Sequence, residues 1–224
     1  MNKLHENDTL EIVINWLVEN LKDNNSFTPH KDNIPTIKSK GIYFWFMRPD
    51  GYKQLSNFVE ITPIVPVYKR IIDGIEYDLV YLGTAGTGKK GYSNLEKRFD
   101  WHINQEHTLG NICHGTLSTL RAGLGSLLSD DLILPNTEML VNEFMAKYMK
   151  LYWIEYPDDK VLIDDDEHKL IDKFRPLLNL QNNPNARANA IANSTQRYKQ
   201  RRNEVKRNTK LRLNCNNNSK KQII

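Results

Sequence analysis

The chain of 224 residues contains only two cysteines, Cys113 and Cys215, and no long uninterrupted apolar run. Two cysteines exclude a disulfide framework and a four-cysteine zinc site. No stretch approaches the roughly 18 consecutive apolar residues of a membrane-spanning helix, so we expect no membrane partner. The first residues carry charges with no apolar run behind them. We therefore expect no signal peptide and a cytoplasmic location.

Acidic residues are nearly absent from the C-terminal segment. Residues 187–224 hold eleven basic residues and one acid, Glu204, a net charge of +10. Residues 1–186 hold 20 basic and 26 acidic residues, a net charge of −6. Clustered Lys and Arg side chains neutralise successive phosphates, so the segment favours an anionic polymer as its partner. A solubilising tail is the alternative.

The rest of the chain has the composition of one packed domain, with 39% apolar and 26% charged residues. Apolar spacing predicts a helix over residues 8–21, capped by Asp8 with Glu11 in a capping box. Further helices are predicted over residues 94–102, 116–128, 137–149 and 167–174. Strands are predicted over residues 41–47, 64–72, 75–82 and 150–155, with a further short one over 161–163.

Turn residues connect these strands. Pro49-Asp50-Gly51 predicts a turn after the first strand, and Asp73-Gly74 predicts a hairpin, because both of its central residues need positive φ. The fold class that follows is α/β, with a small three-stranded sheet, mixed or antiparallel, flanked by helices. An inserted hairpin, a basic C-terminal helix over residues 186–212 and a disordered asparagine-rich tail complete the expected chain.

One motif points to nucleotide hydrolysis. Residues 83–89 follow a predicted strand and match G-x-x-x-x-G-K, the phosphate-binding loop, and residues 161–164 read as an apolar strand that ends in an acid. The motif requires Ser or Thr after the lysine to hold magnesium, and Lys90 stands there instead. A P-loop-like nucleotide hydrolase is kept as an alternative function.

A second set of residues accounts for more of the sequence. Gly41-Ile42-Tyr43 lies on one predicted strand and Tyr81-Leu82-Gly83 ends another. Downstream, Arg98 and His102 are one helical turn apart, and Glu167 is followed twelve residues later by Asn179. This order resembles that of the GIY-YIG nucleases, and of the GIY-YIG restriction endonucleases in particular. Leucine replaces the isoleucine of the second motif.

The resemblance implies a domain organisation. Residues 1–40 would form an N-terminal helix and linker, residues 41–182 the nuclease domain, and residues 183–224 a basic helix and disordered tail. The separation between Tyr43 and Tyr81 is longer than in compact family members, so residues 48–72 are expected to be an insertion.

The resemblance also implies a mechanism, magnesium-dependent hydrolysis of DNA. Glu167 would bind Mg²⁺, or Mn²⁺, and Arg98 would bind the phosphate through its planar fork. Tyr43 would activate water, its pKa lowered by the metal and Arg98, and His102 would relay a proton or orient Tyr43. Tyr81 would orient water or phosphate, and Asn179 would hold Glu167 or the backbone in place.

The expected substrate is double-stranded DNA. The candidate DNA contacts are basic residues of the loop after the second motif, of a small-residue helix and of the C-terminal segment: Lys89, Lys90, Arg121, Arg187, Arg197, Arg201 and Arg202. A palindromic site would call for a homodimer, and a restriction role would call for a cognate DNA methyltransferase. A non-catalytic DNA-binding module is the remaining alternative.

Overall fold

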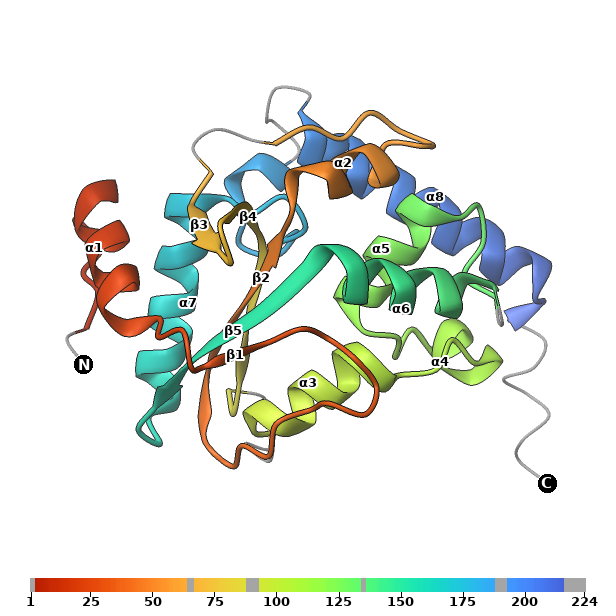
Figure 1. Cartoon of the computed structure of the whole chain (residues 1–224). Helices are drawn as coiled ribbons and strands as arrows, with labels where there is room; N and C mark the ends of the chain where they lie inside the picture. The colour runs from red at the N-terminus through yellow and green to blue at the C-terminus, as the bar shows by residue number, and fades with distance from the viewer. Residues whose placement is uncertain (1–2, 64–66, 88–92, 134–135, 188–192, 216–224) are drawn as a thin grey trace.

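A five-stranded antiparallel sheet forms the centre of the computed structural model, which describes residues 3–63, 67–87, 93–133, 136–187 and 193–215 (Figure 1). The strand order is β1-β5-β2-β4-β3. The bounds are Ser26–Phe27 for β1, Lys40–Met47 for β2, Lys69–Ile72 for β3, Ile75–Ala85 for β4 and Met149–Tyr156 for β5. The α/β class is confirmed, but the prediction of three strands is wrong, because β3 and the short β1 extend the sheet at its two edges.

Eight α-helices surround the sheet in the described part of the chain. They are α1 (Leu10–Asn20), α2 (Pro49–Leu55), α3 (Leu95–Asn104), α4 (Leu109–His114), α5 (Thr119–Leu128), α6 (Asn136–Tyr148), α7 (Lys160–Phe174) and α8 (Ser194–Arg212).

The central strand β2 separates two apolar cores. Its side chains alternate, so that Tyr43 and Trp45 face one core while Ile42 and Phe44 face the other. Helices α1 and α7 cover the Ile42 face, and α2, α3, α5, α6 and α8 cover the Tyr43 face (Figure 1). With both faces covered, β2 is apolar from Ile42 to its end, as expected of a buried central strand.

The β3–β4 hairpin is confirmed at the predicted turn. Asp73 and Gly74 have φ values of 52° and 75°, so both central residues are in the left-handed region. Residues 64–66, part of the predicted strand before this turn, lie outside the described residues, and pairing is seen only from Lys69.

Three local predictions are wrong. Residues 161–163 belong to α7, which begins at Lys160 because the Asp159 side chain accepts a hydrogen bond from the backbone of Leu162. The turn expected at Pro49 is the start of α2, with proline in its first turn. Helix α1 is capped by Thr9, since the Asp8 carboxylate accepts from the backbone of His5 instead.

The two cysteines form one disulfide, Cys113–Cys215, which links α4 to the chain just beyond α8. Disulfides are typical of oxidising compartments, so this bond gives no support to the cytoplasmic location, which stays a prediction. No helix in the described ranges is both long and apolar enough to cross a membrane. The tail from residue 216 onward lies outside the described residues.

Candidate active site

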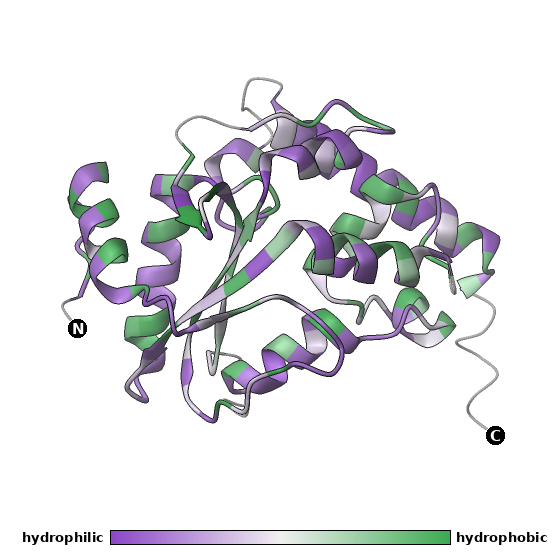
Figure 2. Ribbon diagram, in the orientation of Figure 1, coloured by the Kyte–Doolittle hydropathy of each residue, from purple (hydrophilic) through white to green (hydrophobic). Residues whose placement is uncertain are grey.

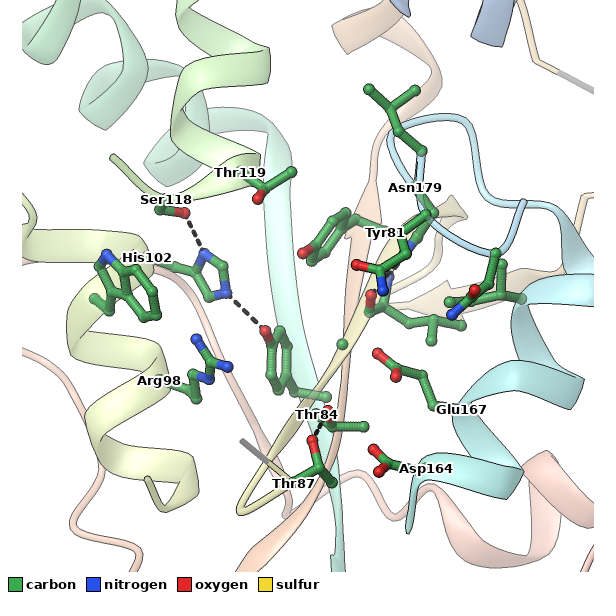
Figure 3. A pocket seen from close by; sticks show the side chains of 18 of the residues that line it. Tyr81, Thr84, Thr87, Arg98, His102, Ser118, Thr119, Asp164, Glu167 and Asn179 are labelled. Carbon is green, nitrogen blue, oxygen red and sulfur yellow. Dashed lines mark hydrogen bonds between the residues drawn. The ribbon is translucent and has the colours of Figure 1, made fainter. Parts of the chain in front are cut away.

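A cavity of about 700 Å³ opens between the ends of β2 and β4, helices α3 and α7, and the loop between α4 and α5 (Figure 3). Its lining includes residues from segments far apart in the sequence. All six side chains expected to be catalytic line it: Tyr43, Tyr81, Arg98, His102, Glu167 and Asn179.

The two tyrosines share one face of the sheet. In the antiparallel pairing of β2 and β4, Tyr43 lies opposite Gly83, and Tyr81 lies opposite Trp45. Directly opposite residues project from the same face, so both phenols point toward the cavity.

Two motif glycines provide space that a side chain would fill. A Cβ on Gly83 would lie 2.5 Å from the hydroxyl oxygen of Tyr43, whose ring extends across the glycine. A Cβ on Gly41 would overlap the carbonyl oxygen of Ile154 on the neighbouring strand. Gly41 therefore permits close backbone approach, and Gly83 makes room for the phenol.

A chain of hydrogen bonds runs from Tyr43 along the wall of the cavity. The Tyr43 hydroxyl lies 2.7 Å from Nε2 of His102, and Nδ1 of His102 lies 2.6 Å from the Ser118 hydroxyl (Figure 3). Ser118 is the N-cap of α5, and its hydroxyl also accepts from the backbone N–H of Arg121. The N-terminus of α5 therefore fixes the imidazole ring that contacts Tyr43.

Burial controls the ionisation of this chain. Burial lowers the pKa of His102 to about 3, with the charges of Arg98 and Arg121 acting in the same direction, so the imidazole is neutral at physiological pH. Burial also raises the pKa of Tyr43 well above its ordinary value, as does the Tyr81 phenol, and Arg98 offsets this only in part. The protein side chains alone thus do not lower the pKa of Tyr43.

Arg98 projects from α3 into the cavity. Its guanidinium stacks over the Trp101 ring, 4.8 Å from the centroid. No described acid forms an ion pair with it, and its Nε has no hydrogen-bond partner among the described residues. The neighbouring Glu96 pairs with Lys38 instead, at 2.6 Å. Arg98 is therefore a positive charge without a counter-ion inside the cavity.

Two carboxylates face Arg98 from α7. Glu167 and Asp164 are three residues apart, hence on one side of the helix, and both line the cavity (Figure 3). Burial and the charge of Asp164 raise the pKa of Glu167 to about 7, and Arg98 lowers it only partly. Neither carboxylate forms an ion pair with a described cation.

These two acids fit a hard divalent cation. Magnesium is commonly held by one or two carboxylates while waters and substrate phosphates complete its coordination. A cation would offset the repulsion between the two carboxylates, which adds to the effect of burial on the pKa of Glu167. Among the described residues, no group of three or more acidic, histidine or cysteine side chains is placed to hold a metal ion.

Asn179 is hydrogen-bonded to the backbone of the sheet and not to Glu167. Its side-chain oxygen accepts from the backbone N–H of Leu82 at 2.9 Å, and its amide donates to the Leu82 carbonyl at 2.8 Å. Beside it, the N–H of Leu178 donates to the carbonyl of Val80. Asn179 thus fixes the β4 segment that carries Tyr81.

The proposed DNA contact by Arg121 is wrong. Arg121 is fully buried, and its guanidinium donates to the carbonyls of His102 and Ile103, to Asn142 and to His107. These bonds cap the last turn of α3 and connect it to α5 and α6. No nucleic acid could reach this side chain.

The other expected DNA contacts differ in availability. Lys89 and Lys90 lie outside the described residues, and Arg187 is exposed. Arg197 donates to the carbonyl of Glu60, and Arg201 to the carbonyls of Ser126 and Ser129 and to Asp130. Arg202, in contrast, forms no ion pair with a described residue.

The fold argues against the nucleotide hydrolase. A phosphate-binding loop joins a strand of a parallel sheet to a helix, whereas all described pairings here are antiparallel. The acid of the second hydrolase motif would end a strand, but Asp164 lies within α7.

Ser118 and Asp164 are among the polar side chains of the cavity that sequence reasoning did not assign to the site. Ser118 begins a helix as serine commonly does, and this capping preference would have placed the start of α5 correctly. Asp164 was assigned to the end of a strand, which concealed its helical spacing from Glu167.

Comparisons with known proteins give a family for the chain. Searches of curated proteins and of solved structures found no match. The family model of the GIY-YIG catalytic domain matches residues 41–204, well over half of the chain and all six residues discussed above. The chain therefore belongs to the GIY-YIG family of nuclease catalytic domains.

Proposed function

We propose that this protein is a magnesium- or manganese-dependent endonuclease that hydrolyses phosphodiester bonds of double-stranded DNA. The observation that carries the proposal is the convergence of two phenols, an unpaired arginine and a carboxylate pair on one cavity, in a chain of this family. Hydrolysis of a phosphodiester needs charge neutralisation on the phosphate, an oriented water and a bound cation.

Arg98 would bind the scissile phosphate. Its guanidinium is held over Trp101 and lacks a counter-ion among the described residues, so its donors are available to phosphate oxygens. The charge stays fixed throughout the reaction.

Glu167 would hold the cation, with Asp164 as a second ligand or as a partner to its bound water. Once bound, the cation supplies charge stabilisation to the phosphate and to the leaving oxygen. In the metal-free protein, burial and the charge of Asp164 raise the pKa of Glu167 to about 7, so the cation would displace a proton from this carboxyl at neutral pH.

Tyr43 and His102 would handle the proton of the attacking water. His102 is neutral, so one ring nitrogen can hold the Tyr43 hydroxyl while the other remains bonded to Ser118. The phenol held in this way would accept the proton of the water in its ionised form. Tyr81 would orient the water from the adjacent strand.

Plasmid cleavage tests the proposal. Wild type should nick and linearise supercoiled DNA with Mg²⁺, whereas Glu167→Gln and Tyr43→Phe should not. Glu143→Gln and Tyr148→Phe serve as matched controls, since both residues lie on α6 away from the cavity. Cleavage by all four variants at the wild-type rate would refute the site, and binding without cleavage by wild type would indicate the DNA-binding module instead.

We further propose a role in restriction or another form of DNA defence. This follows from the order of the six residues, which resembles that of the restriction enzymes in the family. A homodimer and a cognate methyltransferase belong to the same proposal. Sequencing the ends produced from a random-sequence library would show whether cleavage occurs at a palindrome, and cleavage without sequence preference would argue against restriction.

A further inference from the structure

Helix α8 carries its basic residues on two sides that differ in how their charges are satisfied. On one side, Arg201 pairs with Asp130 at 2.6 Å and Arg212 pairs with Asp131. Arg197, on the same side, donates to the carbonyl of Glu60. These arginines attach α8 to α5 and to the loops around it through bonds to carboxylates and backbone carbonyls.

The other side carries Arg202, Lys206 and Lys210, which we call the cationic stripe. The three residues are spaced four apart, so they lie along one side of the helix at about 6 Å intervals. None of them forms an ion pair with an acid in the described ranges. Hydrophilic residues dominate along α8, consistent with a helix whose outer sides face solvent (Figure 2).

The stripe meets the rim of the active-site cavity at Gly115. A methyl group on Gly115 would lie 3.8 Å from Nζ of Lys206 and 3.9 Å from Nζ of Lys210. Lys210 also donates to the carbonyl of Cys113, at the end of α4. Gly115 begins the loop, residues 115–119, that lines the cavity.

The stripe also approaches the cavity at its other end. Tyr198 lies one turn before Arg202, fully buried against Gly123 of α5, and its phenol acts electrostatically on that of Tyr81. Lys206 and Lys210 therefore lie against the α4–α5 loop at Gly115, and Arg202 lies one turn from Tyr198.

The positive charge of the stripe is uncompensated. Burial lowers the pKa of Lys206, and the charges of Arg202 and Lys210 lower it further, with no acid acting in the opposite direction. Three adjacent cations without acidic partners are stable in a folded protein chiefly through solvent or a bound polyanion.

We infer that Arg202, Lys206 and Lys210 contact successive backbone phosphates of the DNA duplex beside the scissile bond. The inference rests on the proposed function, since the phosphodiester in the cavity brings its neighbouring phosphates to the rim. It gives the DNA contacts of α8 to the side of the helix away from Arg201, whose charge is paired with Asp130. The contacts are to the backbone, so they set affinity and register rather than sequence preference.

The test is duplex binding as a function of salt, in a Glu167→Gln background so that the DNA stays intact. Loss of two phosphate contacts in Lys206→Gln/Lys210→Gln should weaken binding about tenfold at low salt and reduce the slope of log K against log salt by about 1.8. The control removes two charges from the helices on the opposite face of the sheet, beside α1 and on α7, in Lys22→Gln/Lys173→Gln, and should change neither quantity (Figure 1).

A conservative variant separates charge from folding. Lys206→Arg/Lys210→Arg should retain the parental slope, whereas damage to α8 would weaken binding in this variant as well. An unchanged slope in the glutamine variant, with the parent bound normally, would overturn the stripe and leave the nuclease proposal intact. No duplex binding by the Glu167→Gln parent would overturn both.

Discussion

The hydroxyl of Tyr43 and Nε2 of His102 lie 2.7 Å apart in a buried environment, although the two residues are 59 positions apart in the sequence. The opposite nitrogen of the ring contacts Ser118. Whether Nε2 of His102 donates to Tyr43 or accepts from it therefore depends on the bond between Nδ1 and the serine hydroxyl. A neutral imidazole has one N–H, so it must donate at one nitrogen and accept at the other.

Ser118→Ala should impair catalysis more than folding. We expect kcat to fall by about tenfold to a hundredfold with little change in KM, since an orienting hydrogen bond is lost while phosphate binding is retained. Loss of the helix cap should cost about 1 kcal/mol of unfolding free energy. Steady-state cleavage kinetics and urea denaturation measure the two effects.

Thr108→Ala is the matched control for that prediction. Thr108 caps α4 through the same kind of bond, accepting from the backbone of Asn111, but it does not contact His102. Equal losses of kcat in the two variants would show that Ser118 acts only as a cap.

Gly83→Ala should abolish cleavage without unfolding the chain. The new methyl group would lie 2.5 Å from the hydroxyl and 2.8 Å from Cζ of Tyr43, so the phenol must move. We expect a stability cost of about 1–3 kcal/mol from the overpacking. Gly110→Ala, where the nearest atom is 3.9 Å away, should leave activity unchanged. A fully active Gly83→Ala enzyme would mean that the position of Tyr43 is unimportant.

Asp164→Asn should raise the metal concentration needed for cleavage. If Asp164 helps Glu167 to hold the cation, half-maximal activity should need about tenfold more Mg²⁺, with kcat at saturating metal largely retained. A magnesium titration of the cleavage rate measures this.

Asp165→Asn is the control at the neighbouring position. Asp165 pairs with Lys3 at 2.9 Å and does not line the cavity, so its loss should not shift the titration. Indistinguishable titrations for the two variants would exclude Asp164 from the metal site.

Two buried histidines should make the fold sensitive to acid. Burial lowers the pKa of both His102 and His107 to about 3, below the ordinary value of 6.5. Between these two pH values the unfolded chain therefore binds protons that the folded chain does not. The contribution of the two neutral histidines to the free energy of unfolding is complete above pH 6.5 and is lost as the pH falls toward 3. At pH 5 each histidine should have lowered the free energy of unfolding by about 2 kcal/mol relative to neutral pH.

The measurement compares His107→Gln with wild type by denaturant unfolding at pH 7.5 and pH 5. The raised pKa of Glu167 works in the opposite direction over part of this range, so the difference between the two chains is the useful quantity. Wild type should lose about 2 kcal/mol more than the variant. Exposed His5→Gln is the control, and parallel losses in wild type and His107→Gln would contradict the prediction.

The sequence was most informative where local patterns coincide with packing. The β-branched and aromatic run of β2 and the Asp73-Gly74 turn predict their elements directly, since a buried strand and a left-handed turn each restrict residue type. The tyrosine, arginine, histidine and glutamate positions came from motif order, and they do line one cavity.

Other features depend on contacts that no local pattern encodes. Arg121 was expected at the surface because it is basic, but carbonyls at the end of α3 and Asn142 of α6 receive its donors in the interior. β1 is only two residues long and is recognised by its pairing with β5. Residues 161–163 resembled a strand because three apolar residues in a row do not distinguish strand from helix.

The pairing of Asn179 with Leu82 has a consequence for assembly. A strand edge normally offers free N–H and C=O groups to a passing chain, but here a carboxamide already occupies both groups of Leu82. Next to it, Leu178 covers the carbonyl of Val80. A second copy of the protein consequently cannot add a strand along this stretch of β4, beyond the end of β3.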